Sequence, residues 1–106
     1  MNKYEELTKA LIRAKDIALI YANSEDGGTC NFDNPAITYK GMKKSLVIKA
    51  IEAAGLRAFD WKLGENYLVI SGGCFGQGNR RTRMAETMTE SLKSSGYQAI
   101  TYYQMD

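Results

Sequence analysis

The chain has 106 residues, of which 44% are hydrophobic and 25% are charged, and its formal net charge is +2. This length and composition predict one soluble domain with a single hydrophobic core, and so small a charge does not by itself indicate a nucleic-acid partner. The sequence lacks histidine, which excludes histidine triads and histidine metal ligands, and its two cysteines are too few for a structural zinc site.

The sequence shows neither an apolar leader segment nor an apolar run of membrane-spanning length. We therefore expect a cytoplasmic protein without a membrane partner, in which Cys30 and Cys74 are thiols.

Residues 1–22 are predicted to form an amphipathic helix, because apolar residues recur at steps of three and four between Tyr4 and Tyr21. This stripe either packs on the core of the domain or forms the seam of a homodimer. Residues 23–35 have the composition of a loop and contain the only proline.

The rest of the chain alternates between strand and helix patterns, with glycine at both expected helix ends. The expected order is a strand at 36–39, a helix at 43–54, strands at 56–61 and 67–71 joined by a turn, a helix at 80–95 and a strand at 97–103. This order predicts an α+β domain over residues 1–106, with a ferredoxin-like split β-α-β-β-α-β antiparallel sheet, an added N-terminal helix, and an α/β sandwich over 36–106.

In such a sheet the loop that enters the first strand and the loop that leaves the third strand lie at the same end. Side chains of these two loops are therefore expected to line one pocket. The set is Cys30, Asn31, Asp33, Cys74, Gln77, Asn79 and Arg80.

Residues 71–83 form a glycine-rich turn between a strand and a helix, where backbone N–H groups favour anions. Arg80, Arg81 and Arg83 lie in the first turn of the expected helix, where the helix dipole disfavours cations, so a negatively charged partner is expected there. The segment has neither the Lys-Ser/Thr of a Walker A loop nor the third glycine of a dinucleotide fingerprint.

The sequence therefore predicts non-catalytic binding of an anionic small molecule that carries phosphate, such as a nucleotide or nucleotide signal. Arg80 and Arg83 would supply charge, Gly76, Gly78 and Asn79 the backbone cradle, and Asn31 and Asp33 selectivity, with Cys30 and Gln77 beside them. Neither a cofactor nor a metal site is expected.

A second hypothesis rests on Cys74 and Arg80, which are separated by five residues between a strand and a helix. This spacing resembles the phosphate loop of the protein tyrosine phosphatases. The resemblance implies Cys74 as the nucleophile, Arg80 as the phosphate clamp and Asp33 or Asp60 as the general acid. Three features depart from that family: it has Ser or Thr where this chain has Arg81, its glycines stand at other positions, and its sheet is parallel.

A third hypothesis is a nucleic-acid partner, whose bases would stack on sheet aromatics. These aromatics are Phe59, Trp61, Tyr67, Tyr102 and Tyr103. A second basic cluster, Lys40, Lys43 and Lys44, is expected at the opposite end from Arg80, and no RNP-type string is present.

A fourth hypothesis is a protein interface, formed with a second copy or with a host protein.

Three segments, 26–33, 76–86 and 102–106, resemble parts of small uncharacterised proteins of bacterial phages and mobile elements. The resemblance implies an accessory role, such as sequestering a nucleotide signal or inhibiting a host nucleic-acid defence enzyme.

Overall fold

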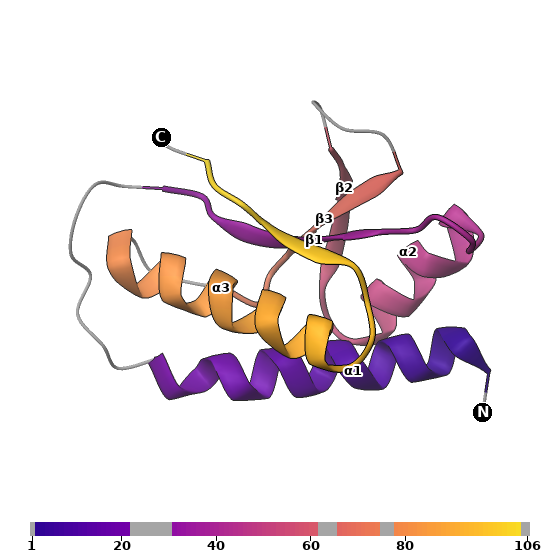
Figure 1. Ribbon diagram of the computed structural model, residues 1–106, viewed down its shortest axis with the longest axis horizontal. Coiled ribbons are helices and arrows are strands. Elements are labelled where there is room, and N and C mark those ends of the chain that lie inside the picture. Colours follow the sequence, from indigo (N-terminus) through magenta and orange to yellow (C-terminus); the bar gives the residue numbers. More distant parts are fainter. Residues whose placement is uncertain (1, 22–30, 62–65, 75–77, 105–106) are drawn as a thin grey trace.

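A computed structural model of the chain describes residues 2–21, 31–61, 66–74 and 78–104 (Figure 1). Its elements alternate between helix and strand after an N-terminal helix. In chain order they are α1 (Lys3–Ala18), the 3-10 turn η1 (Leu19–Tyr21), β1 (Asn34–Thr38), α2 (Lys44–Ala53), β2 (Arg57–Asp60), β3 (Tyr67–Ser71), α3 (Gly78–Ser94) and β4 (Ala99–Tyr102).

The four strands form one antiparallel sheet in the order β2-β3-β1-β4. In its register Ala36 of β1 lies opposite Val69 of β3 and Ile100 of β4, and Phe59 of β2 also lies opposite Val69. Since residues directly opposite each other in an antiparallel pair point to the same side, this row lies on one face of the sheet. The neighbouring residues, such as Ile37 and Leu68, point to the other face.

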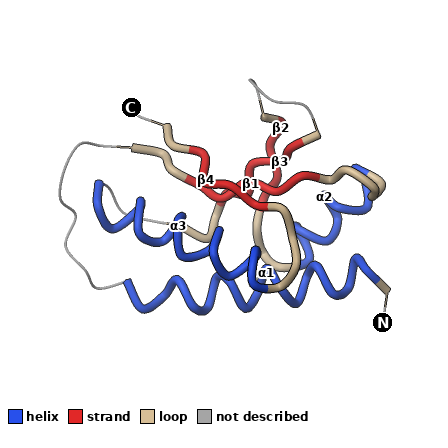
Figure 2. The backbone as a smooth tube through the Cα atoms, in the orientation of Figure 1, coloured by secondary structure: helices blue, strands red, loops and turns tan. Residues whose placement is uncertain are grey.

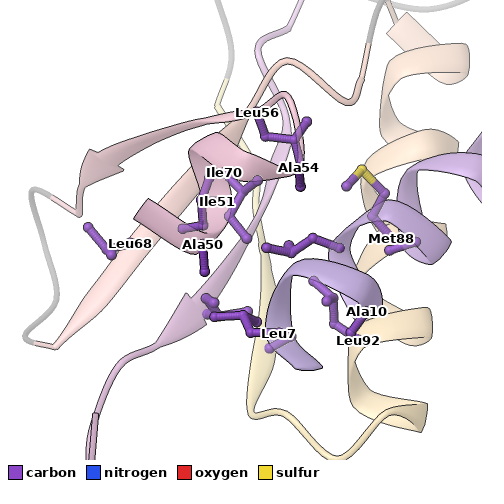
Figure 3. Packing of buried hydrophobic residues seen from close by; sticks show 14 of the residues in the cluster. Leu7, Ala10, Ala50, Ile51, Ala54, Leu56, Leu68, Ile70, Met88 and Leu92 are labelled. Carbon is purple, nitrogen blue, oxygen red and sulfur yellow. The ribbon is translucent and has the colours of Figure 1, made fainter. Parts of the chain in front are cut away.

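The helices α1, α2 and α3 lie on one side of the sheet, and no helix of the described residues covers its opposite face (Figure 2). The helix α3 packs under β1 and β4, α2 packs under β2, and α1 crosses beneath both helices as a third layer (Figure 1). The core therefore lies between the sheet and α1. Figure 3 shows its side chains, with Leu7 and Ala10 of α1 close to Leu92 of α3.

The helix α1 forms where the sequence places it because it has both a cap and an apolar face. The side chain of Asn2 accepts hydrogen bonds from the backbone N–H groups of Tyr4 and Glu5, which satisfies two of the free donors of the first turn. The apolar stripe is buried within the chain. Its buried members are Leu7, Ala10, Leu11, Ala14 and Ala18. The stripe thus packs on the chain's own helices, and it is not free to serve as the seam of a dimer.

The expected elements are present, with shifts at their ends. The strand expected at 36–39 begins two residues earlier, at Asn34, and includes Pro35. The polar side chains that suggested a loop here are instead bonded inside the protein, as Asn34 Nδ2 is to the carbonyl of Phe32 at 3.1 Å. The last strand, expected at 97–103, is shorter and spans Ala99–Tyr102. Most of the expected turn at 62–66 lies outside the described residues.

None of the helices in the described part of the chain is both long enough and apolar enough to cross a membrane.

We predict that Leu11→Ala lowers the free energy of unfolding by about 2–5 kcal/mol, because Leu11 is completely buried between the helix layers and its truncation leaves a cavity. The matched control is Ile12→Ala, one position along the same helix, whose side chain is 40% exposed and which should cost less than about 1 kcal/mol. Urea denaturation followed by circular dichroism measures both. Equal losses would contradict the placement of α1.

Candidate functional site

The segment before β1 meets the first turns of α3, as the sequence predicts for these two regions. Asn31 Nδ2 donates to the carbonyl of Gly78 at 3.1 Å and contacts Thr82 Oγ1 at 3.3 Å. The Thr82 hydroxyl in turn donates to Asp33 Oδ2 at 2.8 Å. Residues about 50 positions apart in the sequence are therefore joined by buried hydrogen bonds at one end of the sheet.

Asp33 is the centre of this junction. Its other carboxylate oxygen accepts the backbone N–H of Gln104 at 2.8 Å, and its backbone carbonyl accepts Arg81 Nε at 3.0 Å. The residue is only 3% exposed, and it connects the start of β1 to α3 and to the segment after β4. Both carboxylate oxygens are thus engaged within the protein, and Asp33 holds three segments of the chain together.

Two glycines of the glycine-rich segment are explained by packing. Gly72 has a φ of 101°, which a residue with a side chain rarely adopts. A Cβ on Gly73 would lie 2.8 Å from Met88 Sδ, so a side chain there would require the Met88 side chain to shift. Gly78 is buried at the start of α3, and Asn79 beside it is exposed. Three expected site residues, Cys30, Gly76 and Gln77, lie outside the described residues.

Arg81 and Arg83 of α3 have different partners. Arg81 donates through its Nε to Asp33 and through a terminal nitrogen to Asn34 Oδ1 at 3.2 Å, and its guanidinium lies 5.9 Å from the ring centre of Phe32. Arg83 lies over the ring of Tyr21 at 6.0 Å, on the side of α1. Arg80 is half-buried. Arg83 therefore lines a different hollow from Arg81.

Cys74 is buried, and its thiol lies 3.8 Å from Met88 Sδ. Burial raises the pKa of the thiol to about 12; the nearby Arg81 opposes this rise and Asp33 adds to it. A nucleophilic cysteine needs a lowered pKa and access to the substrate. Both conditions argue against the phosphatase hypothesis for Cys74.

A groove of about 330 Å³ opens on the uncovered face of the sheet, at the end where β1 and α3 meet. Phe32 and Phe59 contribute its exposed rings, with 42% and 52% of each residue accessible. Polar groups complete the groove. The full lining is Phe32, Asn34, Phe59, Asp60, Val69, Ser71, Arg81, Tyr102 and Gln104.

Aromatic rings also meet above the centre of this face. The ring of Trp61 lies 4.6 Å from that of Tyr102 and 5.7 Å from that of Tyr67. Because Trp61 follows one edge strand and Tyr102 belongs to the other, their rings must reach over the central strands to meet. This explains why Ala36 is completely buried although it points away from the helices.

Four of the five sheet aromatics noted in the sequence therefore share the open face. The fifth, Tyr103, points to the helix side, where its hydroxyl donates to Glu86 of α3. Adjacent residues of a strand point to opposite faces, so the sequence already places Tyr102 and Tyr103 on different faces once the strand itself is predicted.

Sequence reasoning missed several residues of the groove. Asn34 becomes visible only when β1 is extended to it, since it then lies opposite Tyr102 on the same face. Ser71 and Gln104 stand at or beyond the ends of β3 and β4, where the sequence pattern gives no sign of a groove. The position of Arg81 carries no sequence signal that distinguishes it from Arg80 and Arg83.

No family model matches the chain, and comparisons with curated proteins and with solved structures find no match either. The resemblances to phage proteins and to phosphatase loops stay predictions.

We predict that Thr82→Val lowers the free energy of unfolding by about 1–3 kcal/mol, because it removes the hydroxyl that bonds the buried Asp33 carboxylate. Thr87→Val makes the same change on the same helix, in the hollow beside Tyr21 and Arg83, and should change stability by no more than about 0.5 kcal/mol. Urea denaturation compares the two. A loss at Thr87 as large as that at Thr82 would contradict the role of the junction.

We also predict that Cys74 resists alkylation in the folded protein. In a Cys30→Ser background, iodoacetamide at pH 8 should modify Cys74 about a hundredfold more slowly than in urea, because burial raises its pKa and hides its sulfur. Mass spectrometry over time gives both rates. Fast labelling of the folded protein, with a midpoint near pH 7, would instead support a reactive thiolate.

Proposed function

We propose that this chain is a non-catalytic binding protein for a nucleotide-type ligand, which carries both a planar base and a phosphate. The proposal keeps the ligand class that the sequence predicts and places the base in the groove of the open sheet face. The observation that carries it is the combination of two exposed aromatic rings and one arginine around a single groove.

We infer that the fold is the ferredoxin-like split β-α-β-β-α-β arrangement with an added helix. The order of elements after α1 and the strand order β2-β3-β1-β4 support this inference. In this arrangement the helices occupy one face, and the other face is available to a ligand.

The rings of the groove suit the flat faces of a base. Aromatic side chains stack on any base because every base has a π face. Phe32 and Phe59 are the two most exposed rings of the groove, and Tyr102 of the edge strand β4 adds a third ring to its lining. Asn34, Ser71 and Gln104 add amide and hydroxyl groups that can bond the edges of a base.

Arg81 would meet the phosphate. Its guanidinium has five N–H groups, of which its bonds to Asp33 and Asn34 use two. These bonds fix the direction of the side chain, so less conformational entropy is lost when a phosphate binds. An arginine held in this way is suited to bidentate contact with phosphate oxygens.

The chemistry of the described residues favours binding without turnover. The thiol next to the groove end is buried, and its pKa lies near 12. Asp33 is engaged with Thr82 and Gln104, so it is not positioned to act as a general acid.

Trp61 provides the test, because it is the only tryptophan of the chain and its ring contacts Tyr102 of the groove. We predict that the four nucleoside 5′-monophosphates quench its fluorescence with saturation. Phe59→Ala should weaken this binding by about 1–3 kcal/mol, or about 5- to 150-fold, since it removes one stacking surface.

The matched control is Tyr103→Ala, which removes an exposed ring from the helix side of the sheet and should leave the affinity unchanged within about twofold. Affinities are obtained by titration at fixed salt. An absence of saturable quenching with all four nucleotides, or equal losses in the two variants, would refute the proposed site.

A further inference from the structure

We propose that the occupant of the groove is a single strand of nucleic acid, which crosses the open sheet face with several nucleotides. This inference rests on the proposed function and narrows its ligand from a lone nucleotide to a strand.

The aromatic surface exceeds what one base covers. Phe59 lies on the edge strand β2, whereas Phe32 precedes the central strand β1, which is two strands away. Neighbouring strands are about 4.8 Å apart, so the backbones of β2 and β1 are separated by about 10 Å across the sheet. The rings of Trp61 and Tyr102, whose centres are 4.6 Å apart, form a further aromatic surface on the same face. Successive bases of one strand can occupy these separate surfaces, as in proteins that bind single strands by stacking.

Two arginines, Arg57 and Arg81, lie beside different strands of this end of the sheet. Arg57 of β2 is exposed and lies opposite Ser71 of β3, which lines the groove. Arg81 bonds Asn34, which lies on β1 at the same end of the sheet. The backbone of Arg57 therefore lies about two strand spacings from Asn34, which holds the guanidinium of Arg81. A phosphodiester backbone presents a phosphate at each nucleotide and so offers both arginines a partner.

The one acidic residue that lines the groove is partly neutralised. The Asp60 carboxylate forms an ion pair with Lys44 Nζ at 2.5 Å. Among the groove residues and the neighbouring Arg57 the net balance of charge is thus positive, which complements a phosphate backbone. A duplex keeps its base faces stacked inside, so rings on an open sheet favour a single strand over a duplex.

The test uses fluorescein-labelled octamers, dT8 and rU8, a duplex hairpin of equal length, and unlabelled thymidine and uridine monophosphates as competitors. We expect the octamers to bind at least about a hundredfold more tightly than the monophosphates and the hairpin. We also expect log K to fall against log[salt] with a slope of about −1.4, about 0.7 for each of two neutralised phosphates.

Three variants locate the strand. Phe32→Ala and Phe59→Ala should each weaken octamer binding about tenfold or more. Arg57→Ala should weaken it and bring the salt slope closer to zero by about 0.7, whereas Arg13→Ala, which removes an exposed arginine from α1 in the helix layer, should change neither quantity.

The outcomes separate this inference from the proposed function. If octamers and monophosphates bind equally, the nucleotide groove stands and the strand is refuted. If neither binds, both proposals fall. Binding of the hairpin as tight as that of dT8, or equal effects of Arg57→Ala and Arg13→Ala, would also overturn the inference.

Discussion

The packing of every helix on one side of the sheet is the constraint from which the other features follow. One face of the sheet is buried by α2 and α3, and α1 closes these helices from below, so Leu11 and Leu92 are out of contact with water. In the described part of the chain, no helix covers the other face (Figure 2). The rings of Trp61 and Tyr102 meet over its centre, and a groove lies beside them near β1.

The groove depends on a second feature, the junction around Asp33. A buried carboxylate is costly unless its oxygens are bonded, and here the bonds come from two elements, α3 through Thr82 and the segment after β4 through Gln104. The same junction holds Arg81 by the carbonyl of Asp33. One buried acidic residue thus fixes where the start of α3 stands relative to the sheet, and with it the direction of the arginine that lines the groove.

Most of the fold can be predicted from the sequence because its local signals agree. The apolar period of α1, the glycines that end two helices and the apolar run 67–71 place the elements within a few residues. The start of β1 could not be found in this way, since Asp33 and Asn34 have the composition of a loop and are held by partners about 50 to 70 residues away. The site was only partly foreseen for the same reason. Neighbouring arginines look alike in sequence, and only the tertiary contacts distinguish Arg81, which reaches the groove, from Arg83, which lies on Tyr21.

The separation of the two faces has a consequence for how such a protein can change over generations. Residues on the helix side, such as Ile37 and Leu68, are fixed by close packing, and a change in their volume endangers the fold. Phe32 and Phe59 project from the other face and are about half exposed, so selection can exchange them at lower risk of unfolding than the fully buried residues. Natural variants of this scaffold are thus free to diversify in what they recognise while the layer of helices stays the same.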